Sequence, residues 1–380
     1  MKKGEYGLFK LLNISCKKFM EKVLCIVGGM NAGGAETFLM KIFRAIDKKY
    51  FQMDFCVGNV GKGFYDDEII KNGGKIIHVT KKSKNPIKSF FEIRKIVKKG
   101  KYHSVIRISQ HSLSAIDLLA AKLGGAQKCV FRSSNSNSCG NLMNRFLHNI
   151  FIPLAIFIPN VKIAPSDKAA IHMFGKKQLE KGKVKILNNG LDVKSYKFNE
   201  EVRKNKRNEL KLNDNDFLIG HVGRMTKQKN HKFLIDIFIE FLKKNNNAKL
   251  LLIGDGELKN DISIYIKDKH IENYVYFLGI RSDTNELYQA MDCFVFPSLY
   301  EGMPNTVIEA QTSGLKCIIS NKITREVNLT NNVSFCDLSN INDWVSKIEK
   351  SEKREQVYKQ VFEKGYDISD VVNTFIEYIK

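Results

Sequence analysis

Short runs of β-branched and aromatic residues alternate with helical patterns along most of the chain, and this alternation limits the possible folds more than any other feature. Such runs, separated by helices, are typical of parallel strands that helices cover on both faces. The expected strands fall into two sets. They are residues 23–27, 51–57, 75–79, 104–108, 128–131 and 161–164, followed by 217–222, 249–253, 275–277, 293–296 and 316–320.

The length of 380 residues is more than one hydrophobic core usually serves. We therefore expect an α/β protein with two doubly wound domains, and the polar stretch 193–216 as the connection between them. Ligands of doubly wound sheets bind at the carboxyl ends of the strands. A cleft between two such ends is the expected site.

The net charge of +22 lies entirely in the first half of the chain. Residues 1–190 hold 34 Lys and Arg against 12 Asp and Glu, whereas residues 191–380 hold 28 of each kind. This polarity favours an anionic partner, either a phospholipid surface or a nucleic acid. Solvated helix faces of a Lys-rich protein are the alternative explanation.

No run of apolar residues has the length of a membrane-spanning helix. The longest, 150–158, contains Pro153 and falls short of the roughly 20 residues that a span needs, so we expect it to form a buried helix. Residues 1–19 alternate Lys with Leu, Phe and Ile, which is typical of an amphipathic interfacial helix. A disordered extension explains them equally well. The cysteines form no Cys-x-x-Cys pair, so neither a zinc site nor a disulfide framework is expected, and a cytoplasmic setting fits best.

A glycine-rich loop that includes Gly33 and Gly34 follows the first expected strand. Glycines permit close backbone approach, and the helix that opens near residue 35 directs free N–H groups at a ligand. The spacing matches neither Gly-x-Gly-x-x-Gly nor a loop ending in Gly-Lys-Ser/Thr. A nicotinamide dinucleotide site and a P-loop are therefore disfavoured, while a purely structural turn stays open.

Two cations follow the strand expected at 217–222, because Arg224 and Lys229 lie in the loop that begins at Gly223. They suit a diphosphate, which Arg clamps with two N–H donors and Lys meets as a point charge. A surface turn with chance basic residues is the alternative. The loops at Gly254 and Arg281 end the next two strands, where a nucleoside base would lie.

Glu301 and Glu309 flank the start of another expected helix. Pro304 suits the first helical turn, and the N–H groups that precede and open the helix present a positive dipole end to a phosphate. Glu309 is placed to accept both hydroxyls of a ribose, and Glu301 would reach a sugar. Solvent-exposed acids that stabilise a helix dipole are the alternative. The donor-contacting residues expected here are Gly302, Met303, Pro304, Asn305 and Thr306.

Residues 217–234, 250–258 and 276–320 together resemble the C-terminal domain of the retaining GT-B glycosyltransferases of family 4. The Gly-Gly-Ala-Glu of residues 33–36 resembles the acceptor-side loop of that family. The resemblance covers nearly the whole chain from residue 23 and is weaker between 80 and 190.

This resemblance implies two Rossmann-like domains that face each other across a cleft, 20–192 for the acceptor and 193–365 for a nucleotide-sugar donor. It also implies that residues 366–380 cross back onto the first domain, and that neither a metal nor another cofactor is needed. The Asp-x-Asp of metal-dependent glycosyltransferases occurs only at residues 214–216, in an Asn-rich turn where we expect a structural role.

The resemblance also assigns roles. Arg224 and Lys229 match the pair that stabilises the departing diphosphate, Glu301 the acid that contacts the transferred sugar, and Glu309 the acid that binds the ribose. One departure concerns the acceptor side. The family often places a histidine near residue 131, where this chain has Phe-Arg-Ser-Ser-Asn. His111 is the nearest substitute, as a catalytic residue or as a solvated loop histidine.

We therefore expect a cytoplasmic enzyme, peripheral on the inner face of the plasma membrane through its basic half. It would move a sugar, preferably from UDP, to a lipid-linked glycan in bacterial capsule, exopolysaccharide or lipopolysaccharide synthesis. A non-hydrolysing nucleotide-sugar epimerase shares the two-domain architecture, but is not expected to carry the two glutamates. A nucleic-acid-binding protein would explain the charge, but the aromatic residues do not cluster with Lys and Arg, so no nucleic acid is expected.

Overall fold

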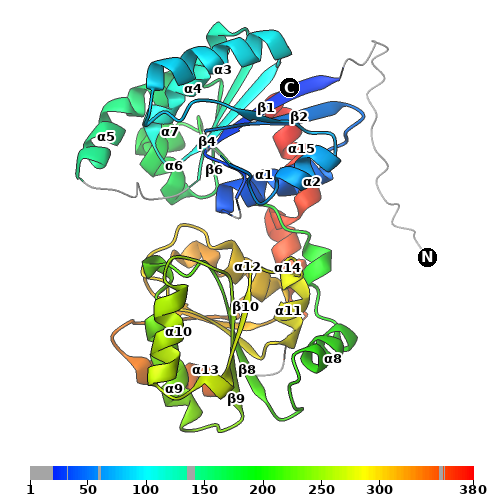
Figure 1. Cartoon of the computed structure of the whole chain (residues 1–380), viewed down its shortest axis with the longest axis vertical. Coiled ribbons are helices and arrows are strands. Elements are labelled where there is room, and N and C mark those ends of the chain that lie inside the picture. Colours follow the sequence, from blue (N-terminus) through cyan, green and yellow to red (C-terminus); the bar gives the residue numbers. More distant parts are fainter. Residues whose placement is uncertain (1–19, 32, 59–60, 135–141, 351–353, 355) are drawn as a thin grey trace.

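The computed structural model describes residues 20–31, 33–58, 61–134, 142–350, 354 and 356–380. The possible amphipathic segment 1–19 lies outside the described residues. Figure 1 shows two domains, each built on a parallel sheet with helices packed against it. The strand orders are β3-β2-β1-β4-β5-β6-β7 and β10-β9-β8-β11-β12-β13. This arrangement confirms the predicted fold class of two doubly wound α/β domains.

The first sheet is buried along its middle. Val23, Leu24, Val105 and Ile106 have no exposed surface, because helices cover both faces of a parallel sheet and leave no polar side. Its strands are β1 (Glu21–Val27), β2 (Phe51–Val57), β3 (Ile76–His78), β4 (Ser104–Ser109), β5 (Lys128–Ser133), β6 (Val161–Ala164) and β7 (Lys185–Ile186).

Two groups of helices cover this sheet. On one face lie α1 (Gly34–Ala45), α2 (Asp66–Lys71) and α15 (Ile368–Ile379). On the other lie α3 (Pro86–Gly100), α4 (Ala115–Leu123), α5 (Leu142–Phe157), α6 (Asp167–Phe174) and α7 (Lys176–Glu180). Figure 1 shows α15 within the first domain. There Phe375 of α15 packs edge-on against Phe38 of α1.

The second domain repeats this plan. Its strands are β8 (Phe217–Val222), β9 (Ala248–Ile253), β10 (Val275–Gly279), β11 (Cys293–Phe296), β12 (Lys316–Ser320) and β13 (Val333–Cys336). Its α-helices are α8 (Glu200–Glu209), α9 (His231–Leu242), α10 (Lys259–Asp268), α11 (Thr284–Ala290), α12 (Asn305–Thr312), α13 (Ile341–Glu349) and α14 (Tyr358–Val361). The short helical turns are η1 (Ser112–Ser114) in the first domain and, after it, η2 (Val193–Tyr196), η3 (Lys227–Lys229), η4 (Glu272–Tyr274), η5 (Arg325–Val327) and η6 (Phe362–Tyr366).

The polar stretch 193–216 is not the connection, because it folds as η2 and α8 within the second domain. Its charges have partners there: Arg203 lies 2.5 Å from a carboxylate oxygen of Asp292. The chain changes domains a few residues earlier, since Leu187 packs in the first core and Leu191 in the second. The high polarity of this stretch therefore reflects ion pairs made by a helix and does not mark a linker.

The apolar run at 150–158 is helical, as expected, but the expectation that it is buried is wrong. It forms the second half of α5, and Ile150 and Phe157 are 51% and 81% exposed. Only one side of the helix packs against the sheet, through residues such as Ala155. The first domain thus presents apolar side chains to its surroundings.

Candidate functional site

Three glycine-containing loops meet at the carboxyl ends of β8, β9 and β10. The Gly223 N–H donates to the Ile253 carbonyl at 2.9 Å, and the Gly254 N–H donates to the Gly279 carbonyl at 2.8 Å. Gly254 has φ +133°, and a Cβ atom there would lie 2.1 Å from the Gly223 oxygen. Only glycine fits this position without strain. The predicted loops are therefore held together at one edge of the sheet.

Lys229 and Glu301 form an ion pair at this edge. The Lys229 Nζ atom lies 2.6 Å from Glu301 Oε1, and the two side chains are only 16% and 11% exposed. The ammonium also lies 4.5 Å from the ring centroid of Phe296. The structure thus joins two residues that the sequence analysis assigned separately, to the diphosphate and to the sugar. The carboxylate fixes the lysine in place, which is useful for a preorganised cation.

Arg224 is exposed and directly follows Gly223. Its charge acts on Glu36, in the first turn of α1 in the other domain. Burial raises the pKa of Glu36, while a hydrogen bond from its own backbone and the charges of Arg107 and Arg224 act in the opposite direction. Arg224 therefore stands on the side of the second domain that faces the acceptor-side loop.

Gly33 and Gly34 open α1 in the first domain, where Gly33 is the N-cap residue. A Cβ atom on Gly33 would lie 2.4 Å from a carboxylate oxygen of Glu36. The glycine therefore leaves room for this acid to fold back over the helix start. Gly33 thus has a structural role in this loop, and a contact of Gly33 or Gly34 with the donor stays a prediction.

The helix α12 begins at Asn305, and Pro304 is its N-cap residue with φ −73° and ψ 111°. Pro304 therefore precedes the helix instead of occupying its first turn, because the chain still has extended geometry there. The first N–H groups of a helix have no partner within it. Among the described residues, the buried Thr306 hydroxyl also has no hydrogen-bond partner. Both features fit a phosphate at this helix start, next to Gly302 and Met303.

Glu309, one turn further along α12, is held at the domain boundary. Its Oε2 atom accepts a hydrogen bond of 3.3 Å from the hydroxyl of the buried Tyr288. Its Oε1 atom lies 3.6 Å from Nζ of Lys41, which belongs to α1 of the first domain. Burial and the negative charge of Glu309 raise the pKa of Tyr196 nearby. The carboxylate thus has the Lys41 ammonium near one oxygen and, near the other, the Tyr288 hydroxyl, which also lies 3.2 Å from the Thr306 carbonyl oxygen.

A second contact between the domains passes through Asn189, which the sequence analysis missed. Its amide nitrogen donates to Asn305 Oδ1 at 2.6 Å, and its amide oxygen accepts from Arg132 at 2.6 Å. The Arg132 guanidinium lies 3.7 Å from the ring centroid of Phe38, and burial lowers the pKa of this arginine to about 9. An arginine inside an apolar strand was the available signal, because a buried guanidinium needs a partner.

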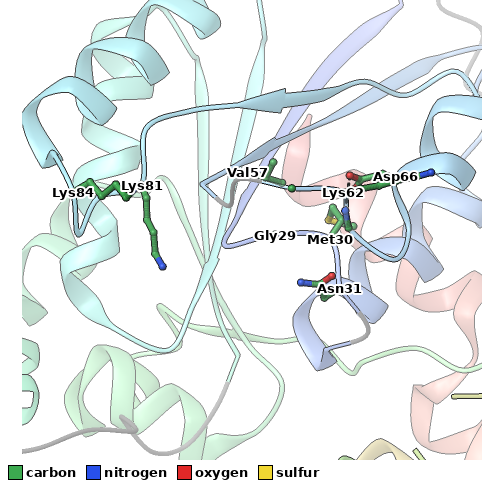
Figure 2. A pocket seen from close by; sticks show the side chains of 10 residues that line it. Gly29, Met30, Asn31, Val57, Lys62, Asp66, Lys81 and Lys84 are labelled. Carbon is green, nitrogen blue, oxygen red and sulfur yellow. Dashed lines mark hydrogen bonds between the residues drawn. The ribbon is translucent and has the colours of Figure 1, made fainter. Parts of the chain in front are cut away.

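A pocket of about 320 Å³ lies beside the acceptor-side loop, at the carboxyl ends of β1 and β2. Figure 2 shows Lys81 and Lys84 on one side of it, with Asn31, Lys62 and Asp66 on the other. Lysines supply positive charge here, while Asp66 is committed to the Gly63 N–H at 2.7 Å. The lining residues are Gly29, Met30, Asn31, Val57, Gly61, Lys62, Gly63, Asp66, Lys81 and Lys84.

His111 and Arg281 have structural partners. His111 Nδ1 accepts from the Leu113 N–H, and His111 Nε2 lies 2.9 Å from the Asn144 carbonyl, so both ring nitrogens are engaged. The Arg281 guanidinium donates to Asp283 at 2.7 Å and to Glu209 at 3.2 Å. These contacts account for both side chains without a substrate, and their predicted roles stay predictions.

Comparisons with known proteins name the family. Residues 202–367 match the family model described as "Glycosyl transferases group 1". EpsF, a glycosyltransferase-family protein of Bacillus subtilis (strain 168), is 30% identical over 368 residues, which are 94% of this chain and 95% of that protein. CapH of Staphylococcus aureus, a capsular polysaccharide biosynthesis glycosyltransferase, is 27% identical over 350 residues, covering 87% and 90%.

A third relative is the UDP-Gal:alpha-D-GlcNAc-diphosphoundecaprenol alpha-1,3-galactosyltransferase of Escherichia coli. It is 29% identical over 247 residues, which are 62% of each protein. Among solved structures, Anabaena HepE in complex with UDP has a TM-score of 0.74 at 17% identity, covering 94% of this chain and 99% of that one. WaaG has a TM-score of 0.71 at 16% identity, with the same coverage. The fold is thus GT-B, and this chain belongs to the glycosyl transferases group 1 family.

Proposed function

We propose that this glycosyltransferase moves a sugar from a UDP-sugar to a lipid-linked glycan, with retention at the anomeric carbon and without a metal ion. The observation that carries the proposal is the grouping of the Lys229–Glu301 pair, the start of α12 and Glu309 in one domain. HepE, which shares the fold, was solved with UDP and with UDP-glucose. The name of the Escherichia coli relative supports a diphosphate-linked lipid acceptor.

The roles of the residues follow the charge that develops during transfer. Glu309 accepts hydrogen bonds from the ribose hydroxyls, while Arg224, Lys229 and the N–H groups at the start of α12 surround the diphosphate. As the bond between the anomeric carbon and the diphosphate breaks, these groups stabilise the leaving oxygen. The acceptor oxygen bonds to the same face of that carbon, and its proton passes to the departing phosphate. Glu301 orients the sugar and keeps Lys229 in position.

The acceptor approaches from the first domain in this scheme. The pocket beside the acceptor-side loop offers the ammonium groups of Lys81 and Lys84. These suit the phosphates of a lipid-linked saccharide. A glycan held there would present a hydroxyl toward the donor site in the second domain.

We also propose that the outer helices of the first domain rest on an anionic membrane surface. The described residues contain no helix with the length and apolar character of a membrane span. On α3, however, Ile87 and Phe91 are 70% and 54% exposed, and on the neighbouring α4 Leu123 is 55% exposed. Lys88 and Lys95 of α3 are exposed as well. Apolar side chains framed by lysines favour a negatively charged lipid interface.

Nucleotide binding and product stereochemistry test the main proposal. UDP and UDP-sugars should raise the unfolding temperature of the wild type more than GDP does, and Glu309→Ala should remove this stabilisation. With a lipid-linked acceptor, NMR should show the same anomeric configuration in product and donor, and EDTA should not reduce the rate. An inverted product, or free epimerised donor formed without acceptor, would contradict the proposal.

A further inference from the structure

Lys41 brings a charge from the first domain into the proposed donor site. It lies on α1, and its side chain is 17% exposed. The ammonium donates to the carbonyl oxygen of Gly190 at 2.8 Å and lies 3.6 Å from Glu309 Oε1. One partner therefore belongs to the segment that connects the domains, and the other to the helix that opens the phosphate site.

The ion pair between Lys41 and Glu309 contributes energetically because both side chains are largely buried. Burial lowers the pKa of Lys41, and the Glu309 carboxylate acts against this effect. An ion pair in such surroundings is less screened than one on the surface. The other oxygen of Glu309 already accepts from Tyr288. A ribose hydroxyl that binds the carboxylate therefore approaches an oxygen that already lies near a protein group.

We propose that Lys41 is a positioning residue that competes with the donor ribose for Glu309, so that nucleotide occupancy and the contact between the two domains are coupled. The inference rests on the proposed assignment of Glu309 to the ribose. Coupling of this kind is reciprocal. The nucleotide weakens the Lys41–Glu309 ion pair by the same free energy by which the ion pair weakens nucleotide binding. Ribose binding weakens the ion pair between Lys41 of α1 and Glu309 of α12, and nucleotide release restores this ion pair.

A second link stays in place when the ion pair weakens. Asn305 lies four residues before Glu309, hence on the same face of α12. Its contact with Asn189 at 2.6 Å does not involve Lys41. The connecting segment therefore keeps its contact with the start of α12, and Asn189 links that start to Arg132 of the first domain while the contact one turn later opens. The expected motion is a small rotation about Asn305, not a separation of the domains.

Binding of uridine to matched variants tests the inference. Uridine carries the ribose without the diphosphate, so a lost positive charge near the phosphates does not affect the result. Lys41→Met should bind uridine more tightly, on the order of five-fold, because Glu309 is left with the ribose as its main new partner. Lys41→Arg should stay close to the wild type. Arg44→Gln is the control, since Arg44 lies on the same helix and pairs with Glu68 of its own domain.

The design separates the inference from the proposed function. A role of Lys41 in fold stability alone would lower the unfolding temperature and leave uridine affinity unchanged, which would overturn the inference. Weaker uridine binding by Lys41→Met would overturn it as well. In either case the proposed function stands if the wild type binds UDP and Glu309→Ala abolishes that binding. If the wild type binds neither uridine nor UDP, the proposed function itself fails.

Discussion

At the scale of single residues, the site depends on charges that hold one another in place. Lys229 serves two groups at once, because it pairs with Glu301 and its ammonium lies near the ring of Phe296. His231, two residues further along the chain, is 3% exposed, and neither of its ring nitrogens has a hydrogen-bond partner among the described residues. The ring of His231 packs edge-on against that of the buried His221 of β8, with 4.7 Å between the ring centroids.

Glu301→Gln should separate binding from transfer. The amide keeps the size of the side chain, but loses the charge that orients the sugar and fixes Lys229. We expect turnover to fall on the order of 100-fold, while UDP affinity is not weakened because Lys229 becomes free for the diphosphate. Calorimetry with UDP and steady-state kinetics measure the two effects. A matching loss of UDP affinity would assign Glu301 to nucleotide binding instead.

His231 should make the fold sensitive to acid. Burial and the charge of Lys229 lower its pKa to about 4, whereas an unfolded histidine titrates near 6.5. The unfolded state thus binds the proton more readily, and stability is lost as pH falls from about 6.5 toward 4, by up to about 3 kcal/mol from this residue. Denaturant unfolding across this range should show a flatter pH dependence for His231→Gln than for the wild type. His270→Asn, at an exposed position, should not flatten it.

At the scale of elements, the sequence predicted the strands that are rich in apolar residues and the loops at their ends. It missed β7 and β13 because they are short edge strands, and β7 is exposed and begins with Lys185. The pairing of Lys41 with Glu309 could not be predicted either. Lys41 has the appearance of a solvated helix residue until the second domain is placed against α1.

The turn at Gly254 offers a test of the loop geometry. Alanine there would require φ +133° and a contact of 2.1 Å with the Gly223 carbonyl. Gly254→Ala should lower the free energy of unfolding by more than about 1 kcal/mol and weaken UDP binding, since the loops after β8 and β9 would move apart. Gly28→Ala is the stability control, because a Cβ there meets nothing within 4 Å. Equal effects of the two substitutions would contradict this account.

At the scale of the whole molecule, the excess positive charge and the exposed apolar side chains of α3 and α4 lie in the same domain. We expect this combination to favour contact of the first domain with an anionic bilayer. The second domain has equal numbers of acids and bases in its half of the chain. Membrane contact at one face would leave the donor site of the other domain open to soluble nucleotide sugar.

Sedimentation with liposomes tests this orientation. The double variant Ile87→Asp and Phe91→Asp should lose most binding to anionic liposomes at low salt, because it places two carboxylates where apolar groups entered the interface. Ile264→Asp is the matched control, at a 58% exposed position on α10 of the second domain. Retained binding by the double variant would move the membrane contact to another face.

The position of α15 also affects how the chain can fold as it is synthesised. Val371, Phe375 and Ile379 are buried in the core of the first domain, although they follow the whole sheet of the second domain along the chain. All strands of the second sheet, β8 to β13, precede α15 in the sequence. The first domain can therefore complete its core only after the sheet of the second domain has been synthesised, and until then the apolar surface of α1 that α15 covers is open to chaperones.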